Sequence, residues 1–371
     1  MAGMSWSPQQ EDARRQVATW LRDRNGPQVF YLAGFAGTGK TTLAKDLASE
    51  AHGEVLYGAF TGKAALVLQR KGCIGASTIH SMIYKPRRKR GGVVEFVLNE
   101  DSAVKKAGLV VIDECSMVDE TLGKDLLSFG TKVLVLGDPA QLPPVRGEGF
   151  FTSRQPDAML TEVHRQAQDS PIIRMSMDVR EGRELTFGVY GASKIIRPRD
   201  VEQGEVLGAE QILIGLNKTR TRYNARIRDL RGFTGQRPHI GERLVCLKNR
   251  HNKGLLNGGL WAVADHMRSD DPDYFEMVVE PSDAGATRQP VDVKVHRFYF
   301  VGREKELEFH QIRGTEQFDF GYALTVHKSQ GSQWDNVFVF DESETFREDA
   351  AKHLYTAITR AAERVTIVRS Q

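Results

Sequence analysis

The sequence predicts an α/β protein with parallel sheets, on three observations. Short apolar runs, at residues 29–33, 109–112 and 132–136, have the composition of strands buried on both faces. Segments with helical spacing follow several of these runs, which is the alternation that builds parallel sheets. A glycine-rich loop joins the first run to its helix. We therefore expect ligands to bind at the carboxyl ends of the strands.

The glycine-rich loop reads Gly34-Phe35-Ala36-Gly37-Thr38-Gly39-Lys40-Thr41, which is a full G-x-x-x-x-G-K-T pattern. It lies between the strand-like run 29–33 and a helical segment, 42–48, as a phosphate-binding loop requires. Its glycines allow backbone N–H groups to surround phosphate oxygens. Lysine would contact the β- and γ-phosphates, and threonine would offer a hydroxyl to Mg²⁺. The sequence thus predicts ATP and Mg²⁺, with contacts from Gly37, Thr38, Gly39, Lys40, Thr41 and Thr42.

Polar side chains follow the other two buried runs. Asp113 and Glu114 end the run 109–112, where Asp113 would hold Mg²⁺ through its water shell and Glu114 would activate the attacking water. The run 132–136 leads into a loop in which Gln141 precedes a stiff Pro-Pro pair. That loop is either a sensor of the γ-phosphate or a proline-rich connector.

Length and composition set limits on the class of protein. The chain has 371 residues, 40% hydrophobic and 27% charged, which is typical of a globular protein with two to three domains. A net charge of +3 neither demands nor excludes a polyanionic partner. The three cysteines form no C-x-x-C pair, which fits a reducing compartment without structural zinc or disulfides. No apolar run reaches the roughly 20 residues of a membrane span, so we expect a cytoplasmic protein.

Two segments interrupt the α/β pattern. We expect a first domain over 1–165 and a second over 166–371, which contains a strand-like run at 211–217 and an arginine-rich helix at 219–230. Residues 82–106 predict a small β-hairpin insert with a basic tip. Residues 231–318 contain short β-like runs and predict a small β-barrel insert in the second domain.

Several residues outside the phosphate loop are candidates for ligand contacts. The Thr61-Gly62-Lys63 segment at a strand end is either a plain turn or a phosphate contact, and His80 allows the same two interpretations. The basic hairpin is either a solvated turn or a nucleic-acid contact with Phe96 or Tyr84 as a stacking wedge. Gln10, in a helix that Ser7-Pro8 would cap, either faces solvent or reads the adenine edge.

The order of the motifs resembles that of the superfamily 1 helicases over nearly the whole chain. The loop QLPPV, the segment HKSQG and the ending TAITRA look like the RecD/Dda branch, whose members translocate 5′→3′ on single-stranded DNA. The full series is Gln10, GFAGTGKT (34–41), AFTGKAA (59–65), STIH (77–80), VVIDECSM (110–117), GDPAQLPPV (137–145), VHRQ (163–166), LTVHKSQGS (324–332) and YTAITRA (355–361).

This resemblance implies roles for individual residues. Gln10 would read adenine, Gly331 would lie at the nucleotide, and Gln141 would couple the γ-phosphate to the DNA groove. Arg165 and Arg360 would be arginine fingers that ATP draws onto its developing negative charge. The strand's phosphates would be held, without regard to base sequence, by Thr61, Lys63, His80, Thr325, His327 and Ser329, with Phe96 as the wedge.

The resemblance also implies the fold and the activity. We expect two RecA-like P-loop domains, with the 82–106 hairpin as a strand-separating pin and the 231–318 insert as an SH3-like barrel. The expected activity is that of an ATP-dependent 5′→3′ DNA helicase acting in a bacterial cytoplasm or, if phage-encoded, in the host. Its partners would be single-stranded DNA, duplex junctions and single-stranded-DNA-binding or replication and repair proteins. The alternatives are an RNA helicase of the same superfamily and a nucleotide-gated binding module that does not unwind.

Overall fold

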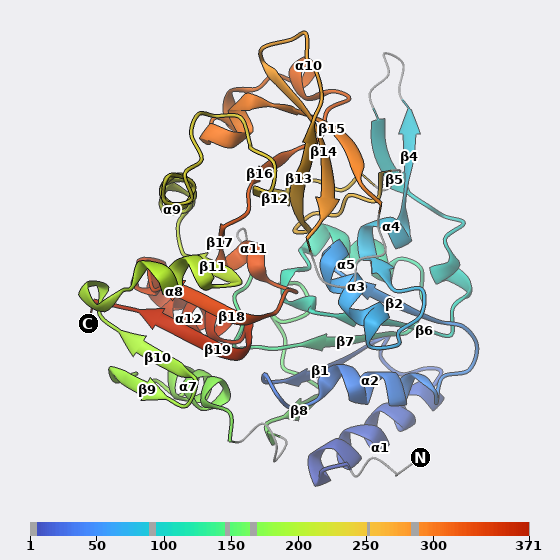
Figure 1. Ribbon diagram of the computed structural model, residues 1–371. Coiled ribbons are helices and arrows are strands. Elements are labelled where there is room, and N and C mark those ends of the chain that lie inside the picture. Colours follow the sequence, from blue (N-terminus) through green and yellow to red (C-terminus); the bar gives the residue numbers. More distant parts are fainter. Residues whose placement is uncertain are drawn as a thin grey trace. The chain divides into compact units, whose positions relative to one another are not determined.

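A computed structural model of the protein describes residues 6–88, 94–144, 149–163, 169–250, 253–282 and 289–370. The chain divides into two compact units, Met1–Glu181 and Gly182–Gln371, which Figure 1 shows in blue to green and in green to red. No helix among the described residues combines the length and the apolar character needed to cross a membrane.

The first unit contains a six-stranded parallel sheet in the order β3-β2-β6-β7-β1-β8. The α/β class and the parallel sheet predicted from the sequence are therefore present. The strands are β1 (Val29–Gly34), β2 (Val55–Ala59), β3 (Ser77–Thr78), β6 (Leu109–Asp113), β7 (Val133–Gly137) and β8 (Ala158–Leu160).

Alternate residues of β1 show how this sheet is covered on both faces. Phe30 and Leu32 pack in one core with residues of α1 (Pro8–Arg22) and α2 (Lys40–Ala48). Tyr31 and Ala33 belong to a second core, which includes residues of α4 (Ile79–Ile83) and α5 (Glu120–Leu127). Because both faces are buried, the strands are almost continuously apolar.

The predicted hairpin contains two antiparallel strands, β4 (Tyr84–Arg88) and β5 (Val94–Leu98). Arg87 lies opposite Glu95 in this register, and their side chains form an exposed ion pair at 3.0 Å. The ends of the segment 82–106 are helical, because Met82 and Ile83 belong to α4 and Ala103–Lys106 form the 3₁₀ helix η1. The basic tip at 89–93 lies outside the described residues.

The second unit contains another six-stranded sheet, in the order β17-β11-β18-β19-β10-β9. It is parallel except at its edge, where β9 pairs antiparallel with β10. The strands are β9 (Gly188–Tyr190), β10 (Ser193–Ile196), β11 (Gln211–Ile214), β17 (Ala323–Thr325), β18 (Trp334–Phe340) and β19 (Ala361–Val368); the α-helices of this unit near the sheet include α8 (Gln203–Gly208), α9 (Asn217–Leu230), α11 (Val326–Ser329) and α12 (Ala350–Ile358).

The interrupting segment of the second unit forms a five-stranded antiparallel sheet, in the order β15-β14-β13-β12-β16. Its core is continuous with that of the parallel sheet, since Trp261 and Met277 lie in the same buried cluster as Ile212 and Phe338. The strands are β12 (Arg243–Cys246), β13 (Leu260–His266), β14 (Tyr274–Pro281), β15 (Val291–His296) and β16 (Phe318–Phe320).

The first compact unit extends beyond the predicted domain boundary at 165. It ends at Glu181 and includes α7 (Pro171–Arg180). The guanidinium of Arg180 lies 3.8 Å from the ring centroid of Phe35 in the glycine-rich loop, a contact that sequence spacing does not reveal. The last helix, α12, ends at Ile358, and Arg360 lies in the turn before β19.

Candidate functional site

The glycine-rich loop has the conformation that phosphate binding requires. Gly37 and Gly39 have φ angles of 79° and 77°, in the left-handed region that a residue with a Cβ rarely adopts. Gly39 is also the N-cap of α2, and it has no side chain to occupy the first N–H groups of the helix. Those N–H groups and the helix dipole favour an anion at this end of α2.

Side chains of the loop hold its shape. The Lys40 ammonium donates to the carbonyl oxygens of Gly34, at 2.6 Å, and Phe35, at 2.9 Å. The hydroxyl of Thr38 donates to the same Phe35 carbonyl at 2.8 Å. Because an ammonium has three protons, Lys40 retains donor capacity for a phosphate oxygen.

Thr41 and Asp113 fit a Mg²⁺ ion. The Thr41 hydroxyl donates to one carboxylate oxygen of Asp113 at 2.9 Å, and the backbone N–H of Glu114 donates to the other at 2.9 Å. Burial, followed by the charge of Glu114, raises the pKa of Asp113 above its usual value. Hydroxyl and carboxylate oxygens are ligands that Mg²⁺ prefers, and a cation would offset this buried negative charge.

Glu114 has an unusual backbone. Its φ of 53° is left-handed, and Arg347 is the other residue besides glycine for which the described chain has a positive φ. Such a conformation costs free energy and tends to persist where a side chain must be held in one place. Its position directly after β6 puts this strain at the strand end where the sequence predicts the general base.

Gln141 follows the neighbouring strand β7. The Asp138 side chain accepts from the Ala140 N–H at 3.0 Å, and the Asp138 carbonyl accepts from the Gln141 N–H at 3.1 Å, which fixes a tight turn. The Gln141 side-chain oxygen is buried and has no hydrogen-bond partner within the described residues. A buried amide without its acceptor bond is costly unless it serves a ligand.

Strand register brings the first-unit candidates to one edge. Ala33 pairs with Gly137, and Ala59 pairs with both Asp113 and Thr78. The glycine-rich loop, the acidic pair, the Gln141 turn, the Thr61 segment and the His80 segment therefore all leave the carboxyl ends of adjacent parallel strands. This is the edge at which α/β sheets bind ligands.

Gln10 lies against the glycine-rich loop. Its side-chain nitrogen donates to the Thr38 carbonyl at 3.0 Å, and its side-chain oxygen accepts from the Ser7 N–H at 3.0 Å as part of a capping box. Its neighbour Gln9, which the sequence analysis did not single out, accepts from the N–H groups of Thr161 and Glu162 at 2.8 and 3.0 Å. The only signal in the sequence was the Gln-Gln pair after a helix cap.

The nucleic-acid candidates of the first unit fall into two groups. Thr61 caps α3 (Gly62–Arg70) by accepting from the Ala64 N–H at 3.1 Å, and Lys63 lies in the first turn of that helix. The ring of His80 lies 4.7 Å from Phe96 and 4.7 Å from Tyr84, measured between centroids. Phe96 is 52% exposed, so this aromatic cluster has a solvent-facing ring.

The second-unit candidates form a compact turn after β17. Thr325 caps α11 by accepting from the Lys328 N–H at 3.3 Å, and the Ser329 hydroxyl donates to the Val326 carbonyl at 2.7 Å. The ring of His327 lies 5.7 Å from that of Phe346, and burial lowers the pKa of His327. The hydroxyls of Thr325 and Ser329 thus both shape the turn that presents His327.

Arg360 is buried and held by three hydrogen bonds. It donates to the carbonyls of Thr356 and Ser332 and to the hydroxyl of Thr359, each at 3.2 Å. The Ser332 bond ties the turn before β19 to the segment that contains Gly331. Arg165, the other predicted arginine finger, lies outside the described residues.

These features define a P-loop nucleotide-binding protein with two parallel α/β sheets. A family model described as an AAA domain matches residues 5–200, more than half of the chain. A second model, described as a UvrD-like helicase C-terminal domain, matches residues 320–368. The chain belongs to the AAA-domain family, and its C-terminal segment is similar to the UvrD-like helicase C-terminal domain.

Individual relatives agree with this assignment. The chain is 30% identical over 383 residues to the ATP-dependent RecD2 DNA helicase of Deinococcus radiodurans, covering 94% of this chain and 48% of that protein. It is 36% identical over 166 residues to the ATP-dependent DNA helicase dda of Enterobacteria phage T4, covering 40% of this chain and 37% of that protein.

A crystal structure of Bacteroides Pif1 bound to single-stranded DNA has the same fold, with a TM-score of 0.57, 17% identity and coverage of 98% of this chain and 92% of that one. By contrast, the chain spans about half of RecD2 and less than a third of the conjugal transfer protein TraA of Agrobacterium fabrum.

Proposed function

We propose that the protein is an ATP-dependent DNA helicase that translocates 5′→3′ on single-stranded DNA and unwinds duplex. One observation carries this proposal: adjacent strand ends of one sheet hold both the nucleotide candidates and the strand-gripping candidates. A γ-phosphate at such an edge can change the position of groups that hold DNA. The names of RecD2 and dda as DNA helicases, and the binding of single-stranded DNA by a Pif1 structure, support the choice of substrate.

The hydrolytic roles follow from the side-chain chemistry. Lys40 and the N-terminus of α2 bind the β- and γ-phosphates, and Glu114 accepts the proton of the attacking water. Mg²⁺, held by Thr41 and Asp113, would neutralise phosphate charge when bound. Three more residues complete the proposed site: Gln141 would detect the γ-phosphate, and Arg165 and Arg360 would stabilise its negative charge.

The remaining predicted residues would hold DNA. Thr61, Lys63 and His80 of the first unit, with their second-unit counterparts Thr325, His327 and Ser329, would bind phosphates of one strand. Such contacts are independent of base sequence. The exposed ring of Phe96, on the antiparallel pair β4–β5, supports a role as the wedge of a strand-separating pin. We assign the five-stranded insert as the SH3-like barrel of a second RecA-like domain.

A tailed-duplex assay tests this proposal. We expect ATP-dependent unwinding of a duplex with a 5′ single-stranded tail, and none of the same duplex with only a 3′ tail. Lys40→Ala should abolish the reaction. The matched control is Lys45→Ala, which removes an exposed lysine from the same helix. Unwinding from the 3′ tail would overturn the polarity, and unwinding by the Lys40→Ala variant would overturn the nucleotide site.

The same protein preparation separates the two rival functions. Stimulation of ATP hydrolysis by RNA rather than DNA would identify an RNA helicase, since the proposed phosphate contacts do not distinguish a 2′-hydroxyl. Nucleotide-dependent DNA binding without unwinding of either substrate would identify a gated binding module. Both outcomes would contradict the proposal.

A further inference from the structure

Helix α9 carries five basic residues, and the structure separates them into two faces. Arg220 and Arg228 are buried, whereas Lys218, Arg222 and Arg226 are exposed. From sequence alone the five look like one charged surface. Their different surroundings show that they have two different roles.

The inward arginines are structural. Arg220 forms an ion pair with Asp319, and Arg228 binds both carboxylate oxygens of Glu242 at 2.7 and 2.9 Å. A buried charge with a bidentate partner is internally compensated and contributes little field at the surface. These two residues are therefore unavailable to an outside partner.

The outward residues form a basic stripe, which we define as Lys218, Arg222 and Arg226. Their spacing of four residues places them on one side of the helix, about 6 Å apart along the axis and about 12 Å from end to end. Within the described chain none of the three forms an ion pair. A row of three charges without ion-pair partners, about 12 Å long, can contact up to three phosphates of one DNA strand.

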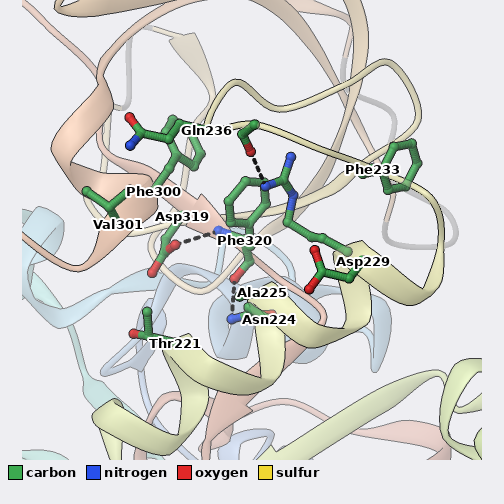
Figure 2. A pocket seen from close by; sticks show the side chains of 12 residues that line it. Thr221, Asn224, Ala225, Asp229, Phe233, Gln236, Phe300, Val301, Asp319 and Phe320 are labelled. Atoms are coloured by element: carbon green, nitrogen blue, oxygen red, sulfur yellow. Dashed lines mark hydrogen bonds between the residues drawn. The ribbon is translucent and has the colours of Figure 1, made fainter.

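A pocket borders the stripe on one side. It has a volume of about 270 Å³ and lies between α9 and the segment of the insert around Phe300 and Phe320. Figure 2 shows the side chains of Asp229 and Asp319 among those that line it. Arg228 also lines the pocket, and Asp319 is paired with Arg220, so Asp229 is the acid that bears on the stripe. Asp229 lies one turn beyond Arg226 on nearly the same side of the helix and would disfavour a phosphate beyond that end of the stripe.

We propose that the basic stripe binds the phosphate backbone of duplex DNA. Single-strand grips combine basic groups with aromatic rings on which bases stack. The aromatic residue of this helix, Tyr223, is half-buried with its ring 4.5 Å from that of Phe340. A row of cations without an exposed ring therefore matches a paired backbone better than an unpaired strand. This inference rests on the proposed function, since it assigns the surface that holds the duplex being unwound.

The salt dependence of binding tests the stripe. For the triple variant K218A/R222A/R226A we expect the slope of log affinity against log salt, on a tail-free DNA hairpin, to fall by about 2.7, or about 0.9 per lost phosphate contact. Binding to single-stranded DNA and its stimulation of ATP hydrolysis should be unchanged. K218R should keep the full slope, because it keeps the charge.

The matched control removes three exposed basic residues elsewhere in the same unit. Lys305, Arg313 and Arg364 are exposed and, within the described chain, form no ion pair, so K305A/R313A/R364A removes the same charge as the stripe variant. An equal loss of salt slope in this control would show that the effect comes from net charge alone, and it would overturn the assignment. An unchanged hairpin slope in the stripe variant, or a matching loss on single-stranded DNA, would also overturn it. Failure of the helicase proposal would give a different result: single-stranded DNA would not stimulate ATP hydrolysis by the wild-type protein.

Discussion

The carboxyl edges of the two parallel sheets are built in different ways. In the first unit the backbone of one short loop fixes the nucleotide candidates, with Gly37 and Gly39 in left-handed conformations and Lys40 bonded to loop carbonyls. In the second unit a distant helix holds the motif strand, since Asn224 of α9 accepts from the Ala323 N–H at 2.8 Å and donates to the Ala323 carbonyl. The first edge is local in sequence, whereas the second depends on tertiary packing.

The largest expected effect follows from the local edge. Lys40→Ala should lower the kcat of ATP hydrolysis by at least about 10²–10³-fold, because it removes a charge aimed at the phosphates. Steady-state hydrolysis with saturating single-stranded DNA measures this loss, with Lys45→Ala as the control that keeps wild-type activity. Full hydrolysis without Lys40 would mean that the first edge does not act as a nucleotide site.

The packing of the second unit should affect its unfolding free energy. Arg228→Ala leaves the carboxylate of Glu242 buried without its cation, which we expect to cost about 3–5 kcal/mol of unfolding free energy. Arg222→Ala, an exposed change on the same helix, should stay within about 0.5 kcal/mol. Urea unfolding followed by tryptophan fluorescence measures both. Similar costs for the two variants would contradict the separation of α9 into a structural and a surface face.

These contrasts explain what the sequence could predict. The phosphate loop and the strand-end acids were predictable because glycine conformation and strand burial are local properties. The burial and pairing of the arginines in α9 were not predictable, since Arg220 pairs with a residue 99 positions away. For the same reason the sequence does not show that α7 packs with the first unit, because the contact of Arg180 with Phe35 joins residues far apart in sequence.

The second unit contains a histidine that should make its stability depend on pH. His353 is buried, its ring stacks 4.1 Å from that of Phe346, and neither of its ring nitrogens has a partner among the described residues. Burial, assisted by the neighbouring His327, lowers the pKa of His353 to about 3. Because the folded-state pKa lies below the unfolded value of 6.5, the contribution of neutral His353 is complete above pH 6.5 and is lost as the pH falls toward 3.

Comparison with His353→Phe isolates this contribution. Between pH 6.5 and pH 5 the wild type should lose about 1.6 kcal/mol more unfolding free energy than the variant. Unfolded His353 is already half protonated at pH 6.5, and each further unit of pH corresponds to about 1.36 kcal/mol for one proton. The carboxylates near this ring, such as Asp349, are common to both proteins and cancel. Urea unfolding at the two pH values measures the difference. Parallel pH profiles would show that His353 does not titrate differently on folding.

The smallest expected effect concerns the threonine helix cap that both edges share. Thr61 and Thr325 each cap the helix that follows a strand, by accepting from the Ala64 and Lys328 N–H groups. Replacement of either by alanine should cost about 1 kcal/mol of stability, and replacement by serine, which keeps the cap, should cost less. Because a hydroxyl carries no charge, the affinity of both alanine variants for single-stranded DNA should fall without a change in its salt slope. A changed slope would mean that the cap positions charged side chains nearby, and the two edges would then grip DNA through those cations rather than through the threonines themselves.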